Sequence, residues 1–245
     1  MVTAEDIVKI PYTTHPGMRR RTGPLYTANP DPRVLASKQQ EDLLWGHDLW
    51  GQIKGSEPLV WLAASRLGHC TDAIQELAMT REEDLAIVEG GRLVAIAFYH
   101  PSGFVPQKYL GWPLEDIHRK VADSDLLVRA TPKIAQALTE QAWQRTVWTV
   151  TQDPRLSNHP NRTKPTAAQS LDDLYVRWEL QTTEPLNHNS ALFLVRVRVE
   201  PLKNWPLDLI TASINSMSEA VLDYKNLRAI KSLINREAAA VSQMI

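Results

Sequence analysis

The stretch from Glu82 to His118 reads EEDLAIVEGGRLVAIAFYHPSGFVPQKYLGWPLEDIH, and it decides the fold. Two apolar runs, Leu85–Val88 and Leu93–Phe98, flank the pair Gly90-Gly91. Glycine accepts the positive φ angles of a two-residue hairpin turn, so this pattern predicts two antiparallel strands. Prolines then stop the second strand, and residues 108–114 predict a turn into a short helix that ends at His118.

The composition favours a soluble globular protein. The chain has 245 residues, 43% of them hydrophobic, with 27 Lys and Arg against 28 Asp and Glu and a net charge of −1. This balance gives no electrostatic reason to expect nucleic acid or an anionic membrane as a partner. No apolar run has the length of a membrane helix, and the first ten residues lack the order of a signal peptide. We therefore expect a cytoplasmic protein.

Cysteine and tryptophan usage bear on cofactors. Cys70 is the single cysteine, which excludes an internal disulfide and a conventional iron–sulfur cluster held by this chain. Electrons for any redox chemistry must then arrive through another cofactor or another chain. Eight tryptophans against three phenylalanines are compatible with a large, partly apolar pocket, although anchoring the core is the more common role of a buried tryptophan.

Helical covers are predicted on both sides of the hairpin in the sequence. The proline-rich residues 1–34 predict an irregular arm, and apolar spacing indicates helices over Val34–Trp50 and Thr71–Met79. After the hairpin, Thr131-Pro132 has the order of cap and first residue and predicts the start of another helix. The segment from Leu207 to about Ala240 predicts two closing helices.

Alternating or β-branched residues predict three further strands, over Thr146–Thr151, Leu174–Thr182 and Leu192–Val199. A long polar loop, residues 153–170, separates the first two, and we expect it to act as a lid.

This order of elements predicts an α+β fold with a PAS-like five-stranded antiparallel sheet. We expect a single domain in which residues 1–79 form the arm and helical cover, 80–202 the PAS-like core and 203–245 the C-terminal helices. In that topology a ligand pocket lies between one face of the sheet and the helices that interrupt it.

The last two predicted strands each carry a polar face. Arg196 and Arg198 share one face of their strand, and Arg177 and Glu179 share one face of theirs. Two interpretations are open. These faces are solvated and carry cross-strand Arg–Glu pairs, or they converge on a pocket. In a pocket the arginines, with Arg145, would bind carboxylates or propionates, and Glu179 would be an acid, a base or a partner for an amine.

A series of short motifs lies between about residues 80 and 202. In order along the chain they are Glu83-Asp84-Leu85, Pro101-Ser102-Gly103-Phe104, Lys108-Tyr109-Leu110-Gly111-Trp112-Pro113-Leu114, Ile117-His118, Arg145 with Trp148, Arg177-Trp178-Glu179-Leu180-Gln181-Thr182 and Phe193-Leu194-Val195-Arg196. In order and spacing the series resembles the haem-dependent oxidative N-demethylase family, many of whose members are known as a domain of unknown function. Leu180, Val147 and Phe104 stand where the family pattern has arginine, asparagine and tryptophan.

The resemblance implies a b-type haem in the PAS-like pocket and O₂-dependent oxidation of a small N-methyl amine. It implies electrons from NAD(P)H through a partner reductase with flavin and an iron–sulfur cluster. On this interpretation Lys108, Arg145 and Arg196 hold propionates or a substrate anion. Glu179 would hold a substrate ammonium or relay protons, with Arg196 beside it in catalysis. The other implied cofactor contacts are Trp148, Arg177 and Arg198.

His118 is the candidate axial ligand of the haem, because neutral imidazole binds iron well. A capping or surface role is the other interpretation of His118, and His100 and His159 are reserve ligands. We expect His118 and the polar faces of both strands to line one pocket.

A second class of function stays open. The chain would then be a non-catalytic PAS-like module that binds haem or another small molecule as a sensor or carrier. Sensors of this kind usually adjoin a coiled coil, and the sequence has no sustained heptad repeat, which favours the enzyme. A homo-oligomer is compatible with either function.

Overall fold

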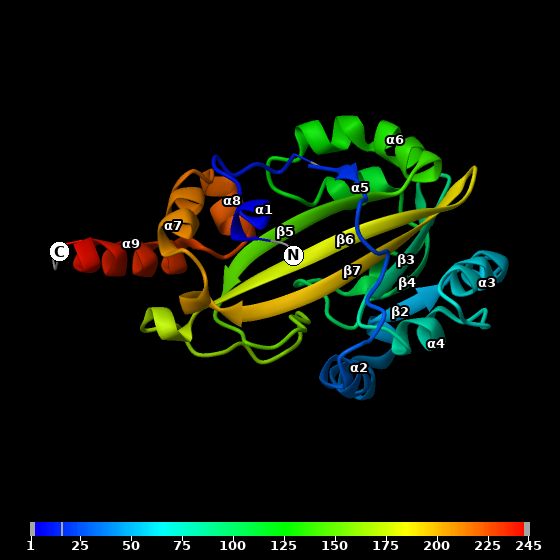
Figure 1. The fold of residues 1–245 in the computed structure, drawn as a ribbon, viewed down its shortest axis with the longest axis horizontal. Helices are drawn as coiled ribbons and strands as arrows, with labels where there is room; N and C mark the ends of the chain where they lie inside the picture. Colours follow the sequence, from blue (N-terminus) through cyan, green and yellow to red (C-terminus); the bar gives the residue numbers. More distant parts are fainter. Residues whose placement is uncertain (1–2, 16, 243–245) are drawn as a thin grey trace.

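The computed structural model describes residues 3–15 and 17–242. It has an α+β fold in which, within these residues, one antiparallel sheet of seven strands has the order β1-β5-β6-β7-β3-β4-β2 (Figure 1). The strands are β1 (Arg19–Arg20), β2 (Trp50–Gln52), β3 (Asp84–Glu89), β4 (Arg92–Ala97), β5 (Trp143–Thr151), β6 (Tyr175–Asn187) and β7 (Ser190–Pro201).

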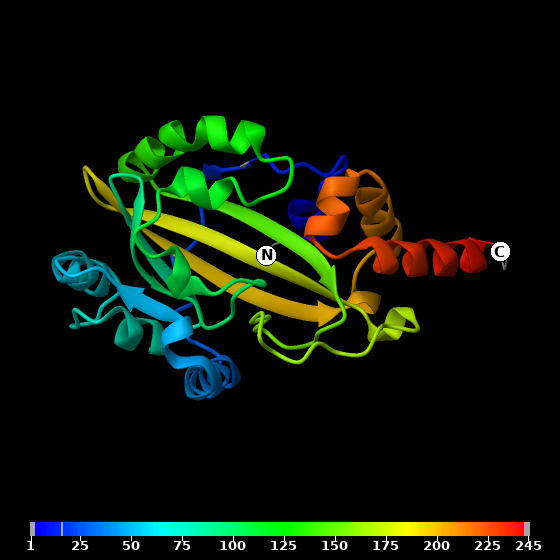
Figure 2. The same ribbon diagram turned by 180° about the vertical axis from the view of Figure 1, so that it is seen from behind.

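Helices cover both faces and one end of the sheet (Figures 1 and 2). The α-helices are α1 (Ala4–Ile7), α2 (Pro32–Trp45), α3 (Glu57–Arg66), α4 (Ile74–Met79), α5 (Leu114–His118), α6 (Asp125–Glu140), α7 (Leu207–Asn215), α8 (Glu219–Tyr224) and α9 (Arg228–Ser242). Short 3₁₀ helices are η1 (Gly46–Asp48), η2 (Pro106–Tyr109), η3 (Leu171–Asp173) and η4 (Leu202–Asn204). In the described chain, no helix combines the length and apolar character needed to cross a membrane.

The predicted hairpin is confirmed. Strands β3 and β4 pair from Glu89↔Arg92 onward, and Gly90 (φ +54°) and Gly91 (φ +72°) turn between them with the positive φ angles of a type I′ turn. The predicted number of five strands is wrong, because β1 and β2 add short edges to the sheet. β1 pairs with β5 and β2 with β4. Two or three paired residues are too few for a periodic pattern to reveal.

The helix predictions need four corrections. α6 begins at Asp125, not at Thr131-Pro132, and buries Leu127, Thr131 and Leu138 at helical spacing, so the apolar pattern already starts before the proline. The helix predicted over Val34–Trp50 ends at Trp45, and β2 follows.

The described C-terminal segment has three helices instead of two, since Asn226 at φ +55° separates α8 from α9. Residues 58–64 lie in α3, and α4 begins at Ile74, three residues after the predicted start at Thr71. The loop predicted over residues 153–170 is confirmed as a segment without helix or strand.

The two faces of the sheet have different covers, and we name them by those covers. The arm face is crossed by the N-terminal arm, where Leu25 O accepts from Thr182 Oγ1 (2.8 Å) and Thr27 Oγ1 accepts from Arg196 (2.8 Å) (Figure 1). The α5 face lies under η2 and α5, which pack on Ala86, Ile96 and Phe193 (Figure 2).

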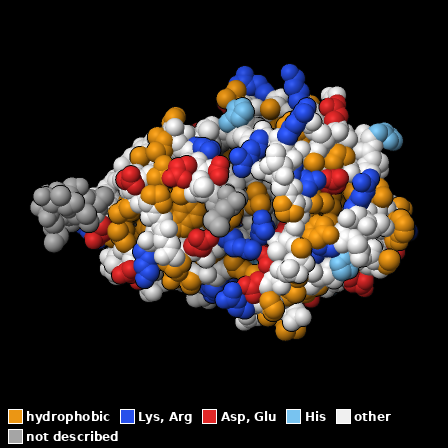
Figure 3. Space-filling model, viewed as in Figure 1, with side chains coloured by type: hydrophobic (Ala, Val, Ile, Leu, Met, Phe, Trp, Pro, Cys, Tyr) orange, Lys and Arg blue, Asp and Glu red, His pale blue; other side chains and the backbone are white. Residues whose placement is uncertain are grey.

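Two large apolar clusters hold the arm face at its ends. One joins β3, β4 and β7 to α3 and α4, and the other joins β5 and β6 to α7, α8 and α9. Between them the arm supplies polar contacts, and Figure 3 shows acidic and basic side chains interspersed over this face. The centre of the arm face is therefore sealed by hydrogen bonds and ion pairs.

A buried ion pair anchors the end of the hairpin. Lys38 Nζ lies 3.1 Å from Asp84 Oδ1, with both side chains at most 1% exposed, and it also donates to the carbonyls of Ala78 and Glu83. The Asp84 carboxylate accepts the backbone N–H groups of Tyr99 (3.1 Å) and His100 (2.9 Å). A buried charge is tolerated only with such partners. Asp84 thus fixes the path of the chain as it leaves β4.

Candidate functional site

A row of polar side chains crosses the α5 face on β5 and β6. In an antiparallel pair, residues directly opposite each other point to the same face. The register places three sets of paired residues on this face: Arg145, Gln181 and Val195; Val147, Glu179 and Val197; and Thr149, Arg177 and Val199. Arg145, Arg177 and Glu179 therefore share this face. For Arg177 and Glu179 this follows from the alternation, and Arg145 joins them through the register of β5 with β6.

Arg196 and Arg198 do not join them, and the expectation of one common pocket is wrong for these two residues. Arg196 pairs with Leu180 and Arg198 with Trp178, so both arginines point to the arm face. Arg196 donates to Thr27, and Arg198 binds Glu82 at 2.5 Å. Strand alternation had identified the polar face of each strand but not the register between the strands, and the register decides whether two faces coincide.

Two other candidates also lie off the polar row. Trp148 pairs with Trp178 on the arm face and belongs to the apolar cluster there, with 5% of its surface exposed. Lys108 is exposed on η2, and its charge acts on His159. Within the described residues neither side chain contacts the row of Arg145, Gln181 and Glu179.

The buried guanidinium of Arg177 joins three segments of the chain. It donates to the carbonyl of His100 (2.8 Å), to Ser102 Oγ (2.9 and 3.1 Å) and to the carbonyl of Leu156 in the loop 153–170. Glu179 lies 3.7 Å away. Arginine suits this place because its planar fork presents five N–H donors in fixed directions. Its donors are used within the protein, so Arg177 organises the site.

Glu179 is the centre of the polar network. Its Oε1 accepts from Ser102 Oγ (2.6 Å) and its Oε2 from Gln181 Nε2 (2.9 Å). Gln181 Oε1 in turn accepts from Arg145 Nε at 2.6 Å. The carboxylate retains further lone pairs for another cation or donor.

Residues from the C-terminal helices reach the same network. The charge of Glu179 acts on Tyr224 at the end of α8 and on Lys225 after it. Lys225 Nζ donates to the carbonyl of Trp148 (2.9 Å) and lies 5.3 Å from the ring centre of Tyr12. Burial lowers the pKa of Lys225 to about 8, against the opposing effect of the Glu179 charge. The α8 end therefore adds an amine and a phenol to the site.

His118 lies at the end of α5, near the Arg145 edge of the row. Burial, and then the positive charge of Arg145, lower the pKa of His118 to about 4, so the imidazole is neutral at pH 7. Its Nδ1 lies 2.8 Å from Thr131 Oγ1 on α6. Among the described residues, no side chain or backbone group makes a hydrogen bond to Nε2. A neutral ring with one free nitrogen is the form that binds a metal.

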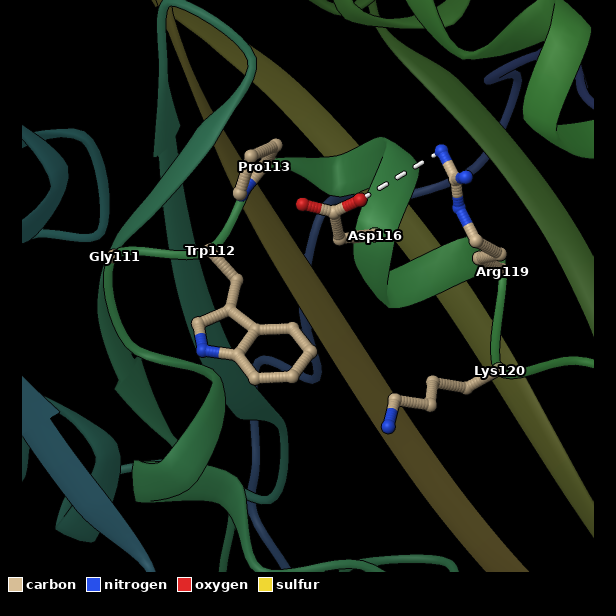
Figure 4. A pocket seen from close by; sticks show the side chains of 6 residues that line it. All are labelled: Gly111, Trp112, Pro113, Asp116, Arg119 and Lys120. Carbon is tan, nitrogen blue, oxygen red and sulfur yellow. Dashed lines mark ion pairs between the residues drawn. The ribbon is translucent and has the colours of Figure 1, made fainter.

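Aromatic rings form the wall beside α5. Phe104 contacts Phe98 (ring centres 6.1 Å apart) and Tyr109 (5.6 Å), and Tyr109 contacts Trp112 (5.2 Å). Beyond Trp112 is an open surface pocket of about 610 Å³ (Figure 4). It is lined by Gly111, Trp112, Pro113, Asp116, Arg119 and Lys120. Trp112 thus belongs both to the aromatic wall and to the lining of this surface pocket.

The reserve histidines lie elsewhere. His100 is buried with Nε2 at 3.1 Å from Ser37 Oγ on α2. Burial holds the pKa of His100 well below its usual value, and the charge of Lys38 acts in the same direction. His159 stacks on Trp45 with ring centres 4.3 Å apart, and burial lowers its pKa too. Both rings thus contact α2, whereas His118 contacts α6 and feels the charge of Arg145.

The sequence did not indicate several members of the network. Ser102 belongs to a quoted motif, but its bonds to Arg177 and Glu179 join residues about 75 positions apart. Tyr224 lies at the end of α8 and Lys225 directly after it, in a segment with no recognisable motif. The Thr131-Pro132 pair has the order of a helix start although it lies inside α6, and this pattern gives no sign that Thr131 contacts His118.

We expect Arg177→Lys to loosen the loop 153–170. A lysine ammonium cannot reach His100 O, Ser102 Oγ and Leu156 O together. The amides of Asn158 and Gly103, which bond across the two loops at 2.9 and 3.0 Å, should then exchange about tenfold faster or more in hydrogen-exchange measurements. Arg198→Lys, on the arm face, is the matched control. Unchanged exchange at both amides in Arg177→Lys would contradict the assignment.

The buried His100 makes stability sensitive to acid. Its pKa is depressed in the folded state, so below about pH 6.5 the unfolded chain takes up a proton that the folded chain refuses. The free energy of unfolding should fall as the pH drops from about 7 to about 5, and this fall should be about 1–2 kcal/mol smaller in His100→Gln.

Urea unfolding at the two pH values measures this difference. His188→Gln, at the exposed tip between β6 and β7, is the control and should keep the wild-type acid sensitivity. Equal acid sensitivity in His100→Gln and the wild type would show that His100 is not buried as a neutral ring.

A search of curated proteins finds no match to this chain. A family model described as haem-dependent oxidative N-demethylase, alpha subunit-like, matches residues 52–234. The match spans most of the chain, including β3 to β7, η2, α5 and α6, and it confirms the resemblance seen in the motifs. The chain therefore belongs to the haem-dependent oxidative N-demethylase, alpha subunit-like family.

Proposed function

We propose that the chain binds a b-type haem on the α5 face and, with a partner reductase, oxidises a small N-methyl amine. The observation that carries this proposal is the neutral imidazole of His118, with a free Nε2, beside the Arg145–Gln181–Glu179 network. The family description supplies haem and N-demethylation as the expected chemistry. The donor set fits a haem: one uncharged nitrogen ligand, an aromatic wall and cationic side chains for propionates.

The sheet supports a PAS-like interpretation of the core. The five longer strands follow each other as β5-β6-β7-β3-β4, and the segment between β4 and β5 contains η2, α5 and α6. A PAS-like pocket lies between the sheet and such intervening helices. On this proposal, β1 and β2 are additions at the two edges.

His118 would be the axial ligand, and Arg145 and Lys225, whose charges interact with that of Glu179, would hold propionates or a substrate carboxylate. Bound haem would supply the activation of O₂. One oxygen atom would leave in formaldehyde from the N-methyl group and the other in water, with two electrons from a flavin and iron–sulfur reductase. Glu179 would bind the substrate ammonium, while Ser102 and Gln181 hold its carboxylate in place.

Haem binding and turnover test the proposal together. The purified chain, supplied with haem, should show a Soret band that shifts on reduction with dithionite and again with CO. His118→Gln should lose this band, whereas His100→Gln, whose ring faces α2, should keep it. With NADPH and a surrogate reductase, dimethylamine should yield formaldehyde, and Glu179→Gln should lower the rate by about tenfold or more at unchanged haem content.

Each result has a distinct meaning. A wild-type protein that refuses haem, or His118→Gln with a wild-type Soret spectrum, would overturn the proposed site. Haem binding that depends on His118 without oxidation of any N-methyl amine would favour the sensor or carrier function instead.

A further inference from the structure

A short chain of hydrogen bonds leads from His118 into the backbone of α6. His118 Nδ1 lies 2.8 Å from Thr131 Oγ1, and this hydroxyl donates to the carbonyl oxygen of Leu127 at 2.9 Å. Thr131 is 4% exposed, so water does not compete for its hydroxyl. The three groups come from α5 and α6, which pack against each other.

Both contacts of the Thr131 hydroxyl are hydrogen bonds with only one protonation of the ring. A carbonyl oxygen only accepts, so the single hydroxyl hydrogen of Thr131 lies on the Leu127 side. Toward His118 the hydroxyl oxygen then acts as an acceptor, and Nδ1 must be the donor. In a neutral imidazole with the proton on Nδ1, Nε2 carries the lone pair.

Thr131 is followed by a proline inside α6. Pro132 has no N–H, so the usual bond from residue 132 to the carbonyl of Val128 is missing and α6 is locally weakened. The Thr131 hydroxyl adds a second donor to the adjacent carbonyl of Leu127. The same hydroxyl therefore contacts both the backbone of α6 and the histidine ring.

We propose that Thr131 is a positioning residue that holds His118 as its Nδ1–H tautomer and leaves Nε2 as the free ligand atom. Histidines that bind metals commonly donate their other ring N–H to an oxygen, which fixes the ring and its tautomer. The tautomer itself rests on the hydrogen bonds described above. The role of Nε2 as an iron ligand rests on the proposed function.

Nitrogen NMR of the full chain without haem tests the tautomer directly. In ¹⁵N-histidine-labelled protein at neutral pH, long-range ¹H–¹⁵N correlations distinguish a protonated Nδ1 from a protonated Nε2, and His118→Gln identifies the signals. The wild type should show His118 with the proton on Nδ1. A proton on Nε2 of His118 in the wild type would overturn the proposal.

Two substitutions at position 131 separate the hydroxyl from the shape of the side chain. Thr131→Val keeps the volume but removes the hydroxyl and should shift His118 toward the Nε2–H tautomer, whereas Thr131→Ser should retain Nδ1–H. Thr139→Val makes the same change on α6 at a hydroxyl bonded to Gln136 O, and should leave His118 unchanged. An unchanged Nδ1–H signal in Thr131→Val would overturn the proposal.

Haem titration separates this inference from the proposed function. If His118 binds iron, Thr131→Val should weaken haem binding by about 10–100-fold and Thr131→Ser should weaken it far less. Wild-type haem affinity in a Thr131→Val protein that has lost the Nδ1–H tautomer would overturn the positioning role. A wild type that has the Nδ1–H tautomer but takes up no haem would instead count against the proposed function alone.

Discussion

The buried guanidinium of Arg177 is the interaction on which the site depends. It reaches from β6 to the backbone of His100, to Ser102 and to the loop 153–170. Moving a guanidinium out of water costs several kcal/mol, and here several hydrogen bonds and the Glu179 carboxylate at 3.7 Å offset that cost. Because Ser102 accepts from Arg177 and donates to Glu179, the same contact that closes the loops also orients the carboxylate.

The exit of β4 is held from both sides by this arrangement. Asp84 accepts the N–H of His100, and Arg177 donates to its carbonyl, so the backbone of this residue is fixed at both polar groups. The buried Lys38 pairs with Asp84 and holds it in position. The ion pair of Lys38 with Asp84 thus helps to hold the backbone next to the site. The loop 153–170 packs against residues 101–103, where the backbone of Asn158 bonds to Pro101 and Gly103.

Patterns within single segments predicted much of this fold, whereas the register between strands could not be predicted from the sequence. The Gly90-Gly91 hairpin, the three long strands and the polar face of each strand follow from residue types and spacing over a few positions. The shared face of Arg177 and Glu179 could be expected from alternation, whereas Arg145 joins them through the register of β5 with β6. The failure for Arg196 and Arg198 has a physical cause, since a shift of one residue in pairing moves a whole set of side chains to the other face. Long-range contacts such as Lys225 with Trp148 leave no local signal.

The proposed site makes one claim about a single atom: His118 Nε2, on the α5 face, is the nitrogen that binds iron. A crystal structure of the haem-loaded protein, with anomalous data at the iron edge, would locate the iron without reference to activity. The account predicts the iron signal on the α5 face within bonding distance of His118 Nε2. Iron on the arm face among Arg196 and Arg198, or bound to His100 or His159, would contradict it.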